Sequence, residues 1–204
     1  MLGKTNVKIK PNKKINFVDF IQSSGTQYID TGVIAKTGLR IVCEFELTSY
    51  KGTDTDSIFG VWGNNSRFFV GADKSKHNFQ YGYIGNYYGS TKKCELNTKY
   101  TVEYEAKSGS QKLIVDGATL LTGTNTSSIS TTQTIFLFNF NSTNTSQTPS
   151  ALKIYSCQIY DNDILIRDYK PVVDGAGAYC LYEEIEKRYY YNRGTGEFIG
   201  GVAT

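Results

Sequence analysis

The sequence predicts an all-β fold in which short antiparallel strands form a sandwich or jelly roll. The first observation is composition: 16 Tyr, 11 Phe and 20 Gly accompany a single Met and a single Trp, and aromatic side chains favour pleated, half-buried strands. The second is periodicity, because apolar and polar residues alternate along most segments, as is typical of strands. A chain of 204 residues suits one large β domain.

Residues 39–48, LRIVCEFELT, give the clearest strand. Alternation places Arg40, Glu44 and Glu46 on one face, so we expect that face to meet solvent and the other to meet the core. The core face carries Leu39, Ile41, Cys43, Phe45 and Leu47. Residues 100–107, YTVEYEAK, repeat the pattern.

Turn signals divide the rest of the chain into strands. SGS at 108–110 and DG at 116–117 predict a three-stranded meander over residues 100–121, the second as a type I′ turn. TIFLFNF at 134–140 is apolar on both faces and predicts a central strand. Residues 151–169 predict two strands around a turn at 161–163. The best helical candidate, 182–189, is better interpreted as a turn between strands.

Three segments carry a resemblance to a known family. They are FIQSSGTQYIDTG at 20–32, KIYSCQIYDNDILIRDYKP at 153–171 and AYCLYEEIEKRYYYNRGTGEFIGG at 178–201. Together they resemble the concanavalin A-like lectin/glucanase jelly rolls, of the laminin-G-like kind found in phage structural proteins and gut-bacterial surface proteins. The resemblance departs at Phe20, where such domains have Tyr, and implies a two-sheet antiparallel sandwich over residues 19–204. It also implies that the opening segment is an entry strand beside which the last strands return.

Catalysis is not expected. Glucanases of this fold carry several carboxylates on one strand face, which act as nucleophile and acid. Glu44 and Glu46 share a face but lack a third carboxylate, and a solvated strand face explains them. The single His77, in DKSKHN, has no nucleophile motif beside it and is expected in an exposed loop.

A glycan platform is the binding function that the residues favour. The segment HNFQYGYIGNYYGS at 77–90 combines tyrosines with glycines and almost no charge, and sugars stack on exposed aromatic rings while amides bond their hydroxyls. The alternative is that the first tyrosines line the core and the last two cap a loop; the single Trp has the same two interpretations. The candidate glycan-binding residues are Trp62, Tyr81, Tyr83, Tyr87 and Tyr88.

Residues 1–18 form a basic arm that the resemblance does not cover. The full chain has a net charge of +3. Without the five lysines of the arm the remainder would carry about −2, which is close to neutral. The arm is either a disordered leader or a segment that docks on an acidic neighbouring subunit. It has no Arg, and no aromatic residue before Phe17, so nucleic acid is not an expected partner. The proposed docking residues are Lys4, Lys8, Lys10, Lys13 and Lys14.

No cofactor, metal or membrane span is expected. Segments 52–57 and 160–164 offer oxygen ligands but lack the pattern of a calcium loop. The four cysteines lie far apart, so they predict small buried or edge thiols rather than a zinc or redox motif. No apolar run reaches membrane-span length, and no signal peptide is recognisable.

These observations lead to one functional prediction and one alternative. The prediction is a non-enzymatic bacteriophage virion accessory protein, such as a capsid decoration, head-fibre or tail-associated subunit, assembled in the bacterial cytoplasm and exposed on the virion exterior. Its arm would dock on other virion proteins, in a homo-oligomer or larger assembly, while its jelly roll touches host-surface glycans. The alternative is a bacterial cell-surface carbohydrate-binding module.

Overall fold

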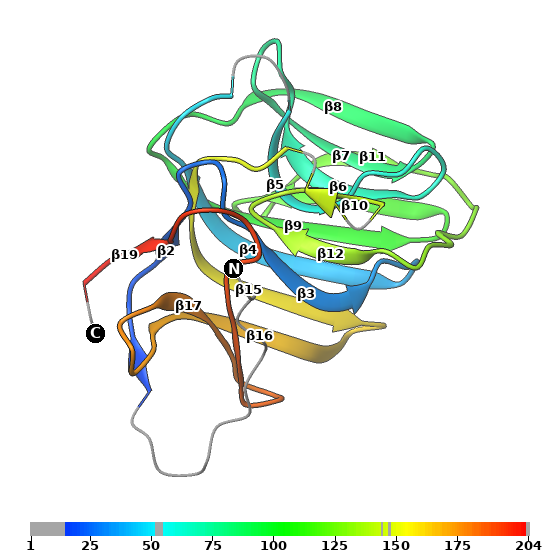
Figure 1. Ribbon diagram of the computed structural model, residues 1–204. Coiled ribbons are helices and arrows are strands. Elements are labelled where there is room, and N and C mark those ends of the chain that lie inside the picture. The colour runs from blue at the N-terminus through cyan, green and yellow to red at the C-terminus, as the bar shows by residue number, and fades with distance from the viewer. Residues whose placement is uncertain (1–14, 52–54, 144, 147, 203–204) are drawn as a thin grey trace.

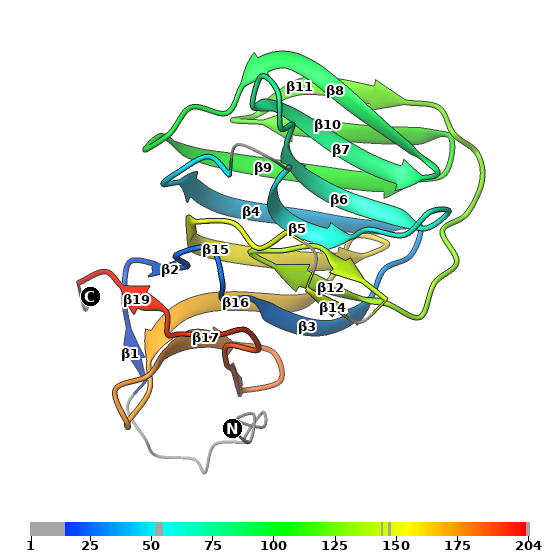
Figure 2. The same ribbon diagram turned by 45° about the horizontal axis from the view of Figure 1, so that its top comes forward.

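The chain folds into two β-sheets packed face to face (Figures 1 and 2). This computed structural model describes residues 15–51, 55–143, 145–146 and 148–202. All regular elements in those ranges are strands, and nearly all pairs of neighbouring strands are antiparallel. Within the same ranges there is no helix of the length and apolarity needed to cross a membrane. The predicted all-β sandwich is confirmed.

The larger sheet contains eight strands in a continuous order and three short strands at its margins. The continuous order is β11 (Ala118–Gly123), β10 (Ser110–Val115), β9 (Lys99–Lys107), β4 (Leu39–Leu47), β15 (Leu152–Asp161), β16 (Ile164–Val173), β17 (Tyr179–Glu183) and β18 (Arg188–Tyr190). The marginal strands are β1 (Asn16–Phe17), β2 (Ile21–Gln22) and β19 (Ile199–Gly200).

The smaller sheet lies opposite and carries the candidate site. Its main order is β14 (Thr145–Ser146), β13 (Asn141–Ser142), β5 (Asp56–Val61), β6 (Arg67–Ala72), β7 (Asn78–Ile84) and β8 (Asn86–Lys93). Beside these, β12 (Thr134–Leu137) pairs with both β5 and β3 (Ile29–Ile34). In Figure 2 the strands β5 to β8 follow one another across this sheet.

The core fills the space between the sheets, as the alternation predicts. The five apolar residues of β4 that face inward are fully buried. Rings from the two sheets meet there: Phe45 packs edge-on against Phe79 at 6.4 Å, and Phe68 lies 5.1 Å from Tyr104, centroid to centroid. Aromatic pairs at such distances stabilise a core beyond the area that they bury.

The predicted turns are confirmed as well. The meander β9–β10–β11 closes at Asp116 and Gly117, both with positive φ (51° and 79°), as a type I′ turn requires. β15 and β16 flank the turn at 161–163, and residues 184–187 turn between β17 and β18. The predicted strand at 134–140 is central but ends at Leu137, because Phe138 takes a φ of 67° and redirects the chain.

The described ends of the chain meet at one margin of the larger sheet. Ile21 of β2 pairs with Gly200 of β19, so the last strand returns beside the entry strand, as the resemblance implied. Residues 16 and 17, assigned by sequence to the arm, pair with β16. The arm lysines 4, 8, 10, 13 and 14 lie outside the described residues.

Candidate functional site

The smaller sheet carries a second aromatic cluster on the face turned away from the core. Along β6, Phe68 and Val70 enter the core, so the alternation of a strand directs Phe69 to the other face. There the Phe69 ring lies 4.6 Å from Phe140 and 4.9 Å from Trp62, centroid to centroid. Phe69 and Phe140 are nevertheless fully buried, and each of the three rings contacts the other two. We call these three residues the outer cluster.

Two glycines make room for Phe69 on this face. Gly60 of β5 and Gly82 of β7 stand directly opposite it in the neighbouring strands. A Cβ at Gly82 would overlap the Phe69 ring, and a Cβ at Gly60 would overlap Phe69 and its neighbour's carbonyl. Gly82 therefore leaves room for the Phe69 ring, and Gly60 lets the backbone of β5 lie close to that of β6.

Trp62 packs over the other two rings of the outer cluster on their solvent side. It follows directly after β5, and its backbone N–H donates to the Asn141 carbonyl at 2.8 Å. Its ring stacks on Phe69 at 27° and on Phe140 at 16°. The side chain is only half-buried, so part of the indole meets solvent.

Arg67 lies between Trp62 and a second exposed ring. Its guanidinium carbon is 5.1 Å from the Trp62 ring centroid and 5.6 Å from that of Tyr87, within cation–π range of both. One Nη donates to the Gly85 carbonyl. The Nε–H is buried and, among the described residues, has no hydrogen-bond partner.

Tyr87 is 61 % exposed and extends the same face onto β8. It pairs with Gly82, and directly opposed residues of neighbouring strands share a face. Two residues farther along, Gly89 has no atom within 4 Å of where a Cβ would stand, so this part of the face is open. We call Trp62, Arg67 and Tyr87 the outer platform.

Exposed amide side chains lie in the segments that carry the outer platform. Asn64 and Asn65 lie in the exposed β5–β6 turn, and Asn86 begins β8 and is also exposed. The turn lies beside Gly85, where a Cβ would be 3.7 Å from Asn65 Oδ1. Neither segment 62–69 nor segment 84–90 contains an acidic residue. The site thus combines ring faces, amides and one cation.

Three of the five predicted glycan-binding residues do not belong to this face. Tyr81 and Tyr83 are fully buried, and the Tyr83 hydroxyl donates to the Ser127 carbonyl at 2.7 Å. Tyr88 is half-buried and stacks on Tyr81 at 4.8 Å on the core side. This corrects the prediction for these three residues, because a ring packed in the core has no face for a sugar. Trp62 and Tyr87 come together, joined by Arg67.

Sequence reasoning missed Arg67 although a signal was present. WGNNSRF places Trp62 and Arg67 on either side of a short turn, which brings the end of one strand beside the start of the next. Tyr87 joins them only through the pairing of β6, β7 and β8, which no local pattern reveals.

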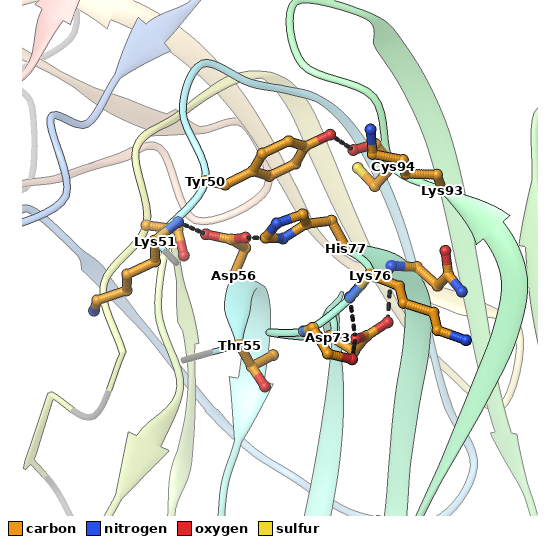
Figure 3. Close-up of polar contacts among 12 residues, drawn as sticks. Tyr50, Lys51, Thr55, Asp56, Asp73, Lys76, His77, Lys93 and Cys94 are labelled. Carbon is orange, nitrogen blue, oxygen red and sulfur yellow. Dashed lines mark hydrogen bonds and ion pairs between the residues drawn. The ribbon is translucent and has the colours of Figure 1, made fainter. Parts of the chain in front are cut away.

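A second polar cluster surrounds Asp56 at the start of β5 (Figure 3). The carboxylate is fully buried; its Oδ1 accepts the Lys51 backbone N–H at 2.9 Å, and its Oδ2 lies 3.5 Å from His77 Nδ1. The imidazole stacks on Tyr50 at 3.7 Å and 6°. Burial raises the pKa of Asp56, opposed by the Lys51 amide and by His77.

The contacts of this cluster indicate a structural role, which is to hold the turn before β7 in place. Asp73 accepts hydrogen bonds from Ser75, Lys76 and Asn78, which outweigh burial and lower its pKa to about 2, so the turn that carries His77 is held rigidly. The half-buried His77 corrects the prediction of an exposed loop residue. The nearby Cys94 thiol is buried and burial raises its pKa, so it is a poor nucleophile. The described residues contain no group of three metal-ligating side chains.

The two glutamates of β4 are engaged by cations. Glu46 accepts Lys153 Nζ and the Tyr155 hydroxyl, each at 2.8 Å, and Glu44 accepts Lys99 Nζ at 2.8 Å. Burial raises the pKa of Glu46, but the bonds from Lys153 and Tyr155 lower it by more, so that the pKa lies below its ordinary value. Glu46 is only 9 % exposed, which corrects the prediction that it lies on a solvated strand face. A carboxylate held ionised in this way is a poor proton donor.

Comparisons with known proteins identify the fold. No family model and no curated protein matches the sequence. Among solved structures, a Bacteroides ovatus protein provisionally described as carbohydrate-binding superposes with a TM-score of 0.65 at 12 % identity; the match covers 95 % of this chain and 62 % of that one. The CBM40 of a Ruminococcus gnavus sialidase, bound to α2,3-sialyllactose, superposes with a TM-score of 0.56 at 17 % identity, and the match covers 72 % of this chain and 91 % of that one.

A pentraxin from Limulus polyphemus gives a TM-score of 0.51 at 15 % identity, covering 74 % of this chain and 76 % of that one. At such identities the likeness concerns the fold alone. The fold is that of the concanavalin A-like lectin/glucanase jelly rolls, which confirms the resemblance read from the sequence.

Proposed function

We propose that the chain is a non-enzymatic carbohydrate-binding module whose binding site is the outer platform. The observation that carries the proposal is the arrangement of the exposed Tyr87 and the half-buried Trp62 on either side of Arg67. Ring faces stack on the apolar faces of sugars, and neighbouring amides bond the hydroxyls. The pairing of Glu44 and Glu46 with lysines supports the absence of glycosidase chemistry.

The biological setting of the module is a separate matter. The first two structural matches are a protein provisionally described as carbohydrate-binding and a carbohydrate-binding module, both from bacteria, and they support the bacterial-surface setting. The virion setting, with docking on other virion proteins through the five arm lysines, has only the sequence behind it. Carbohydrate binding is common to both settings, and it is therefore what we would test first.

The test measures binding of the full chain to a panel of immobilised glycans and bacterial polysaccharides. We expect Trp62→Ala and Tyr87→Ala each to weaken binding about tenfold, or roughly 1.4 kcal/mol. Tyr160→Ala is the matched control, because Tyr160 also lies beneath an arginine, Arg40 at 3.8 Å, but on the larger sheet. Absence of any saccharide ligand, or equal losses in all three variants, would overturn the proposal.

A further inference from the structure

We propose, resting on the proposed function, that the outer platform selects sugars that carry a carboxylate and that Arg67 receives this group. The observation behind this is a charge without a counterion. Arg67 forms no ion pair with any described residue. Segments 62–69 and 84–90, which make the platform, contain no acidic side chain.

Three of the other four arginines are neutralised by carboxylates. Arg40 pairs with Glu103 at 3.2 Å, and Arg167 and Arg188 pair with Glu186 at 2.7 and 3.6 Å. The fourth, Arg193, also forms no ion pair among the described residues, but it is exposed to water, whereas Arg67 is half-buried between two rings. A guanidinium is always charged and costs free energy when it is partly removed from water without an anion. Two ring faces compensate part of that cost. A bound carboxylate would supply the missing anion.

The hydrogen-bond geometry is also that of a prepared site. A guanidinium has five N–H donors, and Gly85 takes one of them. That bond, with Trp62 and Tyr87 beside the guanidinium, restricts its orientation before any ligand arrives. Free Nη donors of an oriented guanidinium match the two oxygens of a carboxylate. The exposed Asn64 and Asn65 of the β5–β6 turn and Asn86 at the start of β8 lie in the same segments of the chain and suit the hydroxyls of the same sugar.

Two sources offer this chemistry: a terminal sialic acid, and a uronic acid within a polysaccharide. Calorimetric titration of the full chain distinguishes them with two matched pairs of probes. The first pair is 3′-sialyllactose and lactose; the second is oligogalacturonate and its methyl ester, which has the same ring without the charge. We expect the acidic member of at least one pair to bind more than tenfold more tightly, with an affinity that falls as salt is added.

The decisive variant is Arg67→Gln, with Arg67→Lys beside it. We expect Arg67→Gln to remove the preference for the acidic sugar, and Arg67→Lys to restore only part of it because Lys cannot form the two parallel bonds. Equal affinity for acidic and neutral partners would overturn this inference. So would tighter binding of a sulfated than of a carboxylated oligosaccharide, or an acidic preference that Arg67→Gln leaves intact.

The outcomes separate this inference from the proposed function. Binding of neutral sugars that depends on Trp62 and Tyr87 but not on Arg67 leaves the proposed function standing and overturns the carboxylate assignment. Absence of binding to every saccharide overturns both. Thermal unfolding of each Arg67 variant excludes misfolding as the cause of a loss. We expect a decrease of only a few degrees, because Arg67 contributes one hydrogen bond to a backbone carbonyl and two cation–π contacts at the surface of the sheet.

Discussion

A single added methyl group tests whether the outer platform rests on Phe69. In Gly82→Ala the new Cβ overlaps three atoms of the Phe69 ring, so the ring has to leave its place on the sheet. Phe69 supports Trp62 at 4.9 Å, and the displacement therefore reaches the platform. Gly89→Ala is the matched control: it lies on the neighbouring strand and the same face, pairs with Gln80, and meets no atom within 4 Å.

The expected cost follows from overpacking. Forcing a methyl group into a packed site costs about 1–3 kcal/mol, and for a chain of this size about 1 kcal/mol lowers the unfolding temperature by roughly 2–4 °C. We expect Gly82→Ala to unfold several degrees below the wild type. The unfolding temperature of Gly89→Ala should equal or slightly exceed that of the wild type, because Ala restricts the unfolded chain more than Gly does.

Fluorescence locates the effect, because Trp62 is the only tryptophan. We expect a red-shifted emission maximum in Gly82→Ala, as the indole loses its contact with Phe69 and meets more water, and no shift in Gly89→Ala. Carbohydrate affinity should fall in the first variant only. Identical melting temperatures and spectra in the two variants would refute the packing argument.

Two further predictions concern buried carboxylates, both measured by urea unfolding at pH 3 to 7. Because burial raises the pKa of Asp56 above its ordinary 3.8, the folded state binds this proton more tightly, and its contribution to stability is lost as pH rises through the raised pKa. The free energy of unfolding of Asp56→Asn should therefore rise relative to that of the wild type between pH 3 and pH 7. A difference between the two proteins that does not change with pH would contradict this. The pKa of Glu46 is lowered, so its contribution is present above the ordinary 4.5 and lost as pH falls. Glu46→Gln should cost about 1–2 kcal/mol at pH 7 and little at pH 3, and an equal cost at both would contradict it.

The parts of the fold that local rules govern could be predicted from the sequence. Alternation assigns each inward residue of β4 correctly, because successive side chains of a strand point to opposite faces whatever surrounds them. The Asp116–Gly117 turn follows from the positive φ that both residues tolerate. Fold-level motifs at 20–32 and 178–201 then supply the architecture, since they fix how the first and last strands meet.

The candidate site could be predicted only in part, because face assignment is not local. β7 alternates Phe79, Tyr81 and Tyr83 with Gln80 and Gly82, and either set could face outward until the sheet is packed. Packing of the two sheets places the three aromatic rings in the core. Arg67 and Tyr87, 20 positions apart, come within cation–π range through two strand pairings. No segment taken by itself therefore predicts this cation–π contact.

The packing of the outer cluster supports the proposal that this face binds a ligand. Glycine in a strand interior usually costs roughly 0.5–1 kcal/mol where Ala would fit, but Ala does not fit opposite Phe69. A Cβ at Gly82 would overlap the Phe69 ring, and a Cβ at Gly60 would overlap the Phe68 carbonyl and the Cα and Cβ of Phe69. Gly82 leaves room for the Phe69 ring, and this ring in turn supports Trp62. A rigid support for an exposed indole reduces the ordering that a ligand must impose when it binds, which is the property a carbohydrate platform requires.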